Sequence, residues 1–263
     1  MIYPESKGIV FDAKEFDMAE IFPVHDAHYG NPCFDERRFR RLINYIKAEP
    51  YRLVCFLGDL MENAVPGSKS DPLTQVHTPL EQREWVAELF LELKDHVICV
   101  TDGNHEWNRS TKMAGLYPLY DACCIAGIPE RYRNAYAAVN VHVGHNANSE
   151  KGRSHKYVGF VTHKAKVLKN FASCDELDGF DFMLYGHDHE ALDHPRAKLA
   201  YDRTHNIVQR VPIEMVNGGA FLDFGDYGAR DGCRAKSAKM YKLVLDGKAH
   251  TIITQGFYEE SLP

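Results

Sequence analysis

The segment FDFMLYGHDHE spans residues 180–190 and places two histidines, His187 and His189, directly after a short apolar run. The apolar part, FDFMLYG, has the length and composition of a buried β-strand. A single histidine at a strand end is most often a polar residue that has found a hydrogen bond. Two histidines one residue apart, preceded by a glycine, instead indicate ligands that converge on a common partner. The rest of the chain must supply the other ligands.

Strands and helices alternate along the part of the chain that precedes this segment. Residues 36–47, ERRFRRLINYIK, repeat apolar side chains at helical spacing, and residues 78–96 open with a Thr78 cap followed by Pro79. From about Tyr132 onward the pattern shifts towards strands. This order predicts an α/β protein. Strand-like runs with polar ends lie at residues 19–26, 51–59, 96–106, 135–143, 157–163, 180–189, 208–219, 238–247 and 249–258.

Five of these runs end in a short cluster of Asp, His or Asn residues. The clusters read VHDAH, GDLMEN, GNHE, VTH and GHDH in chain order. In open α/β sheets, ligands gather at the carboxyl ends of strands, where loops from separate strands converge. The clusters offer neutral nitrogen and hard oxygen donors without a cysteine, a set suited to divalent Mn, Fe, Zn or Ni rather than to a structural zinc knot. The candidate metal ligands are Asp26, His28, Asp59, Asn104, His163, His187 and His189.

Length and composition are those of a globular protein. The chain has 263 residues, of which 44% are apolar and 26% charged, so it can bury a large core. We expect one domain over residues 1–263, because no repeat, low-complexity segment or long linker divides it. No basic stretch followed by an apolar one opens the chain, and no apolar run approaches the roughly 20 residues that span a bilayer. A cytoplasmic protein without a membrane partner is therefore expected.

The cysteines and the net charge exclude few classes of function. Seven cysteines without C-x-x-C spacing, two of them (Cys55 and Cys99) in apolar runs, predict reduced core thiols. The net charge of −6 gives no general attraction to nucleic acid. One dense cationic run occurs in residues 36–47, and we expect it to form a solvated helix face on the outside of the sheet. Its cations are Arg37, Arg38, Arg40, Arg41 and Lys47.

The order of the polar clusters carries a family resemblance. The blocks D-x-H, G-D-x-x-D/E, G-N-H-D/E, H and G-H-x-H follow one another from Asp26 to His189 and resemble the calcineurin-like metallophosphoesterase superfamily. The segments GDLMENAVPGSKSDP, TPLEQ, GNHEWNR and NGGAFLDFGDYGARDG look similar to the single-domain phosphoesterases of bacteriophages and prophages. A phage-encoded or bacterial cytoplasmic protein is consistent with that resemblance.

The resemblance implies a fold, a cofactor and a reaction. The fold would be a four-layer α/β sandwich, with two mixed β-sheets packed face to face and helices outside. Asp26, His28, Asp59 and His189 would hold one divalent transition metal, and Asp59, Asn104, His163 and His187 a second, with Asp59 bridging. Manganese is the expected activator in vitro, with Fe, Zn or Ni as alternatives. The protein would be a hydrolase that cleaves phosphodiesters or small phosphomonoesters by in-line attack of a metal-bridging hydroxide.

Other residues acquire roles from the same resemblance. His105 would be the catalytic histidine, and Glu62, at the second carboxylate of G-D-x-x-D, would orient it. Arg109 is a candidate contact for the substrate phosphate. Asp188 is expected to shape its turn, and Tyr227 and Arg230 could overhang the site. His25, His77, His142 and His145 are expected to be surface or satisfied core histidines.

Two other functions remain open, and several are disfavoured. The same chemistry could act on nucleic acid, as in the superfamily's repair nucleases, or the fold could serve as a non-catalytic scaffold. A scaffold would be expected to lose ligands, whereas all seven candidates and His105 are present. No G-x-x-x-x-G-K-[ST] motif supports a P-loop enzyme. After GDLMEN comes Ala64 rather than the D-R-G continuation of the serine/threonine phosphatases, so the arginine that clamps phosphate in those enzymes is missing and a protein phosphatase is disfavoured.

Overall fold

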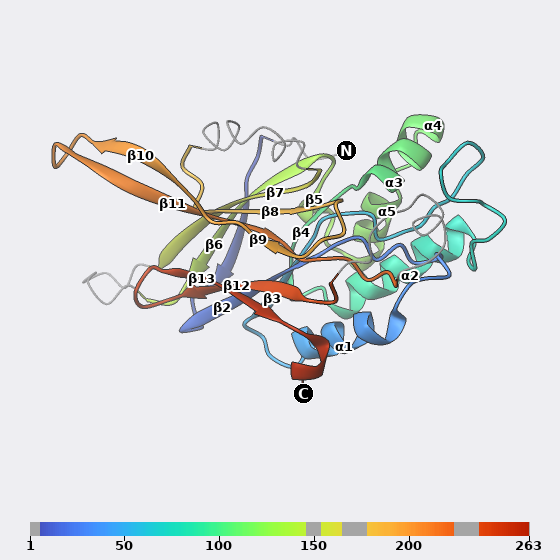
Figure 1. Cartoon of the computed structure of the whole chain (residues 1–263), viewed down its shortest axis with the longest axis horizontal. Helices are drawn as coiled ribbons and strands as arrows, with labels where there is room; N and C mark the ends of the chain where they lie inside the picture. Colours follow the sequence, from blue (N-terminus) through green and yellow to red (C-terminus); the bar gives the residue numbers. More distant parts are fainter. Residues whose placement is uncertain (1–5, 146–153, 165–177, 224–236, 263) are drawn as a thin grey trace.

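Two mixed β-sheets and a group of helices make up the protein in the computed structural model, which describes residues 6–145, 154–164, 178–223 and 237–262 (Figure 1). We call the sheet that contains β8 sheet I and the sheet that contains β3 sheet II. The prediction of an α/β protein with two mixed sheets is confirmed. No helix within these four ranges has the length and apolar character needed to cross a membrane.

Sheet I contains the strand that precedes the two histidines of residues 180–190. Its strand order is β1-β6-β7-β8-β11-β10, with β9 paired to β11. The neighbours of β8, which are β7 and β11, both run parallel to it. The strands are β1 (Ile9–Ala13), β6 (Tyr136–Val143), β7 (His155–Lys164), β8 (Phe182–Gly186), β9 (Leu192–Asp193), β10 (Arg196–Asp202) and β11 (Ile207–Asn217).

Sheet II carries the first three polar clusters. Its strand order is β13-β12-β2-β3-β4-β5, and β2, β3, β4 and β5 are parallel. Their carboxyl ends therefore lie along one edge of the sheet. The strands are β2 (Met18–Val24), β3 (Arg52–Phe56), β4 (Val97–Thr101), β5 (Tyr132–Arg133), β12 (Met240–Asp246) and β13 (Ile252–Phe257).

An apolar core lies between the two sheets. Alternate residues of a strand point to opposite faces. On β3, Leu53 and Cys55 therefore join the core shared with sheet I, while Val54 and Phe56 face the helices. From sheet I, every second residue of β6 enters the same core, beginning with Ala137. Cys55 and Cys99 are both fully buried thiols, as expected.

Helices cover the outer face of sheet II. Helix α1 (Glu36–Lys47) packs on it through the predicted apolar stripe, which includes Phe39 and Ile43. Helix α2 (Pro79–Glu92) has Thr78 as its N-cap in a capping box with Glu81, and Pro79 opens it, as predicted. The remaining helical segments are α3 (Asn104–Glu106), a π-helical turn η1 (Trp107–Thr111), α4 (Lys112–Ala114), α5 (Pro118–Ala126) and the 3₁₀ turns η2 (Pro129–Arg131) and η5 (Glu259–Ser261).

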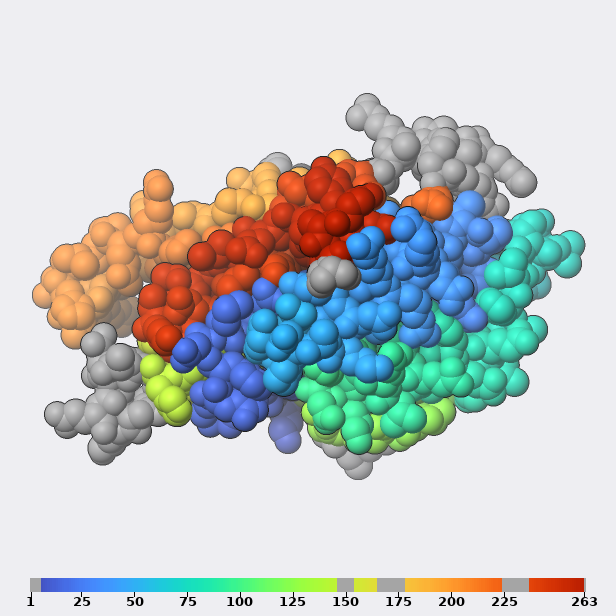
Figure 2. Space-filling model, turned by 90° about the horizontal axis from the view of Figure 1, so that it is seen from below, coloured from blue at the N-terminus to red at the C-terminus, as the bar shows by residue number. Residues whose placement is uncertain are grey.

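The cations of α1 are held by neighbouring parts of the protein. Figure 2 shows the C-terminal residues beside α1, where Arg37 pairs with Glu259 at 2.6 Å and Arg41 donates to the carbonyl of Leu262. The prediction of a solvated face holds for Arg37, but it is wrong for Arg38. The Arg38 side chain is buried, and its guanidinium donates to the carbonyl of Ala220.

The predicted four layers are seen in part. Among the described residues, helices cover sheet II, and none lies on the outer face of sheet I. The residues of β6 that point to that outer face, such as Tyr136 and Asn140, are half-buried. The sequence patterns also missed β1, β10 and α5. The three elements have 5, 7 and 9 residues, and periodicity over such lengths does not always distinguish a strand from a buried helix.

Candidate metal centre

The predicted ligands meet where the carboxyl ends of strands from both sheets come together. In sheet II, Asp26 and His28 follow β2, Asp59 follows β3, and Asn104 begins α3 after β4. In sheet I, His163 lies near the end of β7, and His187 and His189 follow β8. The site therefore lies across the interface of the two sheets. Each sheet contributes ligands that the other lacks.

One donor group consists of Asp26, His28 and His189. Oδ1 of Asp26 lies 3.6 Å from Nε2 of His189 and 3.8 Å from Nε2 of His28. The two Nε2 atoms are 3.2 Å apart. Two imidazole nitrogens that share one metal at about 2.1 Å in tetrahedral geometry would be separated by roughly 3.4 Å. The spacing of this group therefore fits a bound cation.

A second donor group consists of Asp59, His163 and His187. Nε2 of His163 lies 3.2 Å from Oδ2 of Asp59 and 3.3 Å from Oδ1 of Asn104. Asp59 also faces the first group, because its Oδ2 is 4.0 Å from Nε2 of His28. Asp59 is thus the carboxylate that both groups approach.

Two observations indicate that these residues could hold a metal ion. Nδ1 of His163 donates to the carbonyl oxygen of Leu57 at 2.7 Å, so Nε2, which faces the Asp59 carboxylate, must carry a second proton or face a cation. Oδ1 of Asp26 is buried without a hydrogen-bond partner in the part of the chain that the structure describes. Buried lone pairs that face one another are costly unless a proton or a cation lies between them. The buried His and Asp groups could therefore hold a metal ion.

The backbone at the site adopts a sparsely populated conformation. Eight non-glycine residues of the described ranges have positive φ, and five of them are predicted ligands. Such residues cost about 1–3 kcal/mol each and persist only where the surrounding structure holds them. Strain concentrated at one edge of the protein indicates a functional site. The five are Asp26 (49°), His28 (51°), Asp59 (49°), His187 (78°) and His189 (55°).

Two glycines allow the loops after β3 and β4 to touch. Gly58 has φ of 80°, and a Cβ on it would lie 1.9 Å from the backbone nitrogen of Gly103. A Cβ on Gly103 would lie 2.1 Å from Oδ1 of Asp59. No side chain fits at either position. The glycines of the GD and GNH motifs thus bring Asp59 against the start of α3, where His105 N donates to Asp59 Oδ1 at 2.7 Å.

Burial and charge shift the pKa values of the ligands in opposite directions. Burial disfavours the charged form of Asp26, but the imidazoles of His189 and His25 outweigh it and lower the pKa of this carboxyl. Burial likewise opposes protonation of His163, but the Asp59 carboxylate prevails and raises the pKa of His163 to about 9. Without a metal, a proton on His163 thus offsets part of the negative charge of the buried carboxylates.

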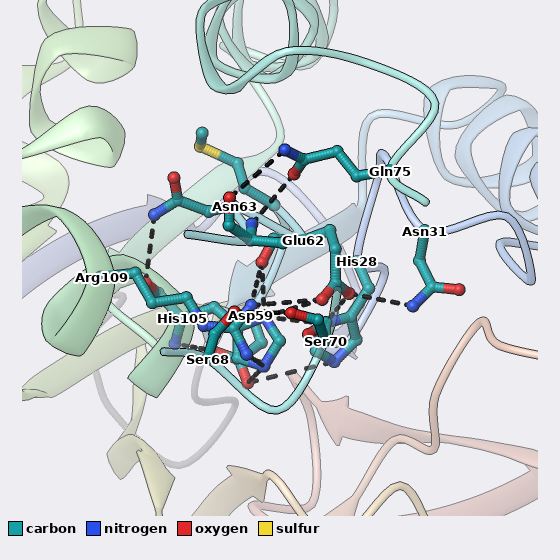
Figure 3. Close-up of polar contacts among 12 residues, drawn as sticks. His28, Asn31, Asp59, Glu62, Asn63, Ser68, Ser70, Gln75, His105 and Arg109 are labelled. Carbon is teal, nitrogen blue, oxygen red and sulfur yellow. Dashed lines mark hydrogen bonds and ion pairs between the residues drawn. The ribbon is translucent and has the colours of Figure 1, made fainter. Parts of the chain in front are cut away.

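Glu62 lies at the centre of a polar network beside the ligands (Figure 3). Its Oε2 is 3.2 Å from Nδ1 of His28 and accepts from Nδ2 of Asn31 at 3.1 Å. Its Oε1 pairs with Arg109 at 3.2 Å. Glu62 therefore orients His28 more directly than His105, whose Nδ1 is 3.9 Å from the carboxylate. A carboxylate on the far nitrogen of a ligating histidine fixes its tautomer and orientation.

His105 and Arg109 form a pair next to this network. Nδ1 of His105 donates to the backbone carbonyl of Glu62 at 2.8 Å, which leaves Nε2 as the acceptor. Nη2 of Arg109 lies 3.1 Å from that Nε2, and Nη1 donates to the same Glu62 carbonyl. Burial lowers the pKa of His105 to about 4. The guanidinium predicted to contact a substrate thus faces Glu62 and His105, with its side chain 11% exposed.

His105 also satisfies the geometry of a ligand. Its Nε2 is 3.9 Å from Oδ2 of Asp59, and it forms a third donor group with His28 and Asp59. The resemblance instead assigns it a catalytic role. The two roles differ in what they predict for metal content, because only a ligand is needed to retain the ion.

Sequence reasoning missed one carboxylate beside the ligands, and it expected His25 to be a surface or satisfied core histidine, which the structure confirms. The buried carboxylate of Glu106 accepts hydrogen bonds from the backbone nitrogens of Asp59 (2.8 Å), Met61 (3.1 Å) and Gly103 (3.0 Å), and burial raises its pKa to about 6. His25 is fully buried and bonds to Asp26. In the sequence, Glu106 could have been noticed as the acidic fourth residue of the GNHE motif. No sequence signal distinguishes His25 from other buried histidines.

The remaining candidates lie apart from the donor groups. Asp188 is exposed, in keeping with a role in its turn, and His145 is exposed as expected. His77 is partly buried, with its ring stacked on Tyr29 at 4.6 Å. The candidates Tyr227 and Arg230 lie outside the described residues.

Comparison with known proteins gave no assignment. No protein-family model matches the sequence. A search of curated proteins also returned no match.

Proposed function

We propose that this protein is a metal-dependent phosphoesterase with a two-metal site and a calcineurin-like fold. The observation that carries the proposal is the meeting of two donor groups, Asp26–His28–His189 and Asp59–His163–His187, with Oδ2 of Asp59 within 4.0 Å of His28 and 3.2 Å of His163. The order of the ligand motifs in the sequence supports the same assignment.

The ligands would divide between two cations that share Asp59. Asp26, His28 and His189 would hold one, and Asn104, His163 and His187 would hold the other. Nitrogen and hard oxygen donors suit Mn, Fe, Zn or Ni, with Mn as the most practical activator in vitro. Bound cations would neutralise the charge of a phosphoester and lower the pKa of a water molecule, which is the chemistry that hydrolysis needs.

The residues around the ligands would hold protons and orient groups. Glu62 holds the proton on Nδ1 of His28 and so keeps Nε2 available to a cation. His105 holds its own proton on Nδ1 and exposes Nε2 towards Asp59 and Arg109. In this arrangement His105 would exchange a proton with the leaving oxygen through Nε2, and Arg109 would stabilise the negative charge next to it.

Small phosphoesters are the proposed substrates. Binding to a nucleic-acid backbone requires cations free to neutralise phosphates. Several cations of the dense run in α1 are paired within the protein. Arg40 and Lys47 contact Glu92 at 3.0 and 2.9 Å, and Arg37 contacts Glu259. Helix α1 also packs on the outer face of sheet II, where it is not among the ligand-bearing loops.

A parallel activity screen tests the proposal. The Mn²⁺-loaded protein is assayed with bis-para-nitrophenyl phosphate, para-nitrophenyl phosphate, cyclic nucleotides, and single- and double-stranded DNA. Hydrolysis of the small esters by the wild type, abolished in Asp59→Asn, is the expected result. DNA cleavage in preference to small esters would make the protein a nuclease. Stable metal binding without turnover of any substrate would favour the scaffold.

A further inference from the structure

The histidine before the first ligand occupies a fully buried position between the two sheets. His25 follows β2 of sheet II and has no exposed surface. Its ring lies against Gly186 at the end of β8, where a Cβ would approach the ring to 2.8 Å. Its other contact is Gly218, directly after β11. Both neighbouring segments belong to sheet I, so His25 connects the ligand loop of one sheet to the other.

The hydrogen bonds of His25 fix its tautomer. The backbone N–H of Gly218 donates to Nε2 of His25 at 3.1 Å. A backbone N–H is only a donor, so Nε2 is an acceptor and the ring proton is on Nδ1. Nδ1 then donates to Oδ2 of Asp26 at 2.7 Å. Both polar atoms of the imidazole have a partner.

These bonds distinguish the two carboxylate oxygens of Asp26. Oδ2 accepts from His25 and also from the backbone nitrogen of His187 at 2.8 Å. Among the described residues, Oδ1 has no hydrogen-bond partner, and it is directed at His189, His28 and His163, whose Nε2 atoms lie 3.6, 3.8 and 3.9 Å away. The oxygen held by His25 is therefore the one that faces away from these ligand nitrogens.

We propose that His25 is a positioning residue that holds Asp26 through Oδ2, so that Oδ1 alone is presented to the metal. The inference rests on the proposed role of Asp26 as a metal ligand. Removal of a hydrogen-bond partner from a ligating side chain typically reduces metal affinity by about 10- to 100-fold. The loss should be largest at the ion held by Asp26, because the side-chain hydrogen bonds of His25 among the described residues are with Asp26 and Gly218.

Two amide substitutions at His25 distinguish a role in holding Asp26 by a hydrogen bond from a role in packing alone. In His25→Asn the amide nitrogen would stand close to the place of Nδ1 and could still donate to Asp26, whereas in His25→Gln the amide would stand near the place of Nε2. Positioning therefore predicts that His25→Asn keeps Mn²⁺ affinity within a few fold and that His25→Gln and His25→Phe lose about 10- to 100-fold at one ion. A role in packing alone predicts the reverse order for the two amides, because glutamine fills more of the space.

The experiment titrates each metal-free protein with Mn²⁺ alone by calorimetry, with stoichiometry checked by metal analysis. His155→Phe is the matched control, since His155 is another buried histidine and its Nε2 lies near the Lys248 carbonyl, far along the strand from the ligands. It should bind two ions like the wild type. Thermal unfolding of the metal-free variants reports any loss of folding, and comparison of the two amides applies even if His25→Phe does not fold.

The outcomes separate this inference from the proposed function. Asparagine and glutamine variants that bind alike, or a glutamine variant that binds better than the asparagine variant, would overturn the role of His25 while leaving the metal site intact. Failure of the wild type to bind Mn²⁺ would overturn the proposed function and the inference together.

Discussion

Oδ2 of Asp59 lies 3.2 Å from Nε2 of His163, although Asp59 follows a strand of sheet II and His163 lies on a strand of sheet I. The contact depends on the packing of the two sheets rather than on either sheet alone. Any change that shifts one sheet against the other should therefore affect metal binding before it affects folding.

The protein is expected to bind two metal ions per chain, with the two ions sensitive to different substitutions. Asp59 approaches both donor groups, whereas Asp26 lies closest to His189 and His28. Asp59→Asn should therefore lose both ions, and His189→Ala should lose only one. Metal analysis after Mn²⁺ loading and desalting gives the stoichiometry. A wild-type value near one that His189→Ala leaves unchanged would contradict the two-metal assignment.

Replacement of His105 by alanine should separate catalysis from metal binding. General acid–base groups contribute roughly 10²–10⁴-fold to turnover, so His105→Ala should lose that much activity on small phosphoesters and retain both ions. The retained metal content is the informative measurement, because Nε2 of His105 also lies 3.9 Å from Asp59. Loss of an ion together with activity would make His105 a ligand.

Mn²⁺ affinity should rise with pH from about 7 to about 9. Burial opposes the charge on His163, but Asp59 raises the pKa of His163 to about 9, so the metal-free protein carries a proton there that a cation must displace. Affinity should increase by up to about tenfold per pH unit while this proton is displaced. Calorimetry in buffers of different ionisation enthalpy counts the protons released. Binding that is independent of pH would show that His163 is not a ligand.

The same proton should stabilise the metal-free protein on the acid side. A histidine whose pKa is raised on folding contributes stability below its unfolded value of about 6.5, and this contribution is lost as the pH rises towards the folded value. The melting temperature of the metal-free wild type should therefore fall over this window. His163→Gln, which cannot titrate, should have a flatter profile.

Charge reversal on α1 should leave catalysis unchanged. Arg37→Glu with Arg41→Glu would break the contacts with Glu259 and with the carbonyl of Leu262, so a small loss of thermal stability is expected. Hydrolysis of small phosphoesters should depend little on ionic strength in both proteins. For comparison, cleavage of labelled duplex DNA is measured at two salt concentrations with both proteins. Efficient, salt-sensitive cleavage that the reversals suppress would support the nuclease alternative.

Alanine at Gly58 should abolish metal binding. Its Cβ would lie 1.9 Å from the backbone of Gly103, so the loops that carry Asp59 and Asn104 would have to separate. Gly127→Ala is a matched control, because Gly127 has a similar φ of 77° but open space around it. The control should lose about 1–2 kcal/mol of stability from backbone strain alone and keep its metal. Equal behaviour of the two variants would show that the close approach is not required.

The sequence by itself determined α1, α2 and the strands that carry the donors, together with the donors that follow each strand. Apolar residues at helical spacing predicted α1 and α2, because one side of a surface helix faces the core and each turn has 3.6 residues. The Thr78–Pro79 pair predicted where α2 begins. The polar clusters at strand ends predicted convergence, because parallel strands direct their carboxyl ends to one edge. The structure brings Asp26, His28, Asp59, Asn104, His163, His187 and His189 together.

Only the tertiary structure decided which atoms face one another. Sequence motifs assigned Glu62 to His105, but packing places the Glu62 carboxylate closer to His28 and in contact with Arg109. His25 has no distinguishing local pattern, and its role depends on Gly186 and Gly218, which are far away in the chain. The pairing of the two sheets is equally non-local. A continuous apolar run shows that both faces of a strand are covered, but it cannot specify what covers them.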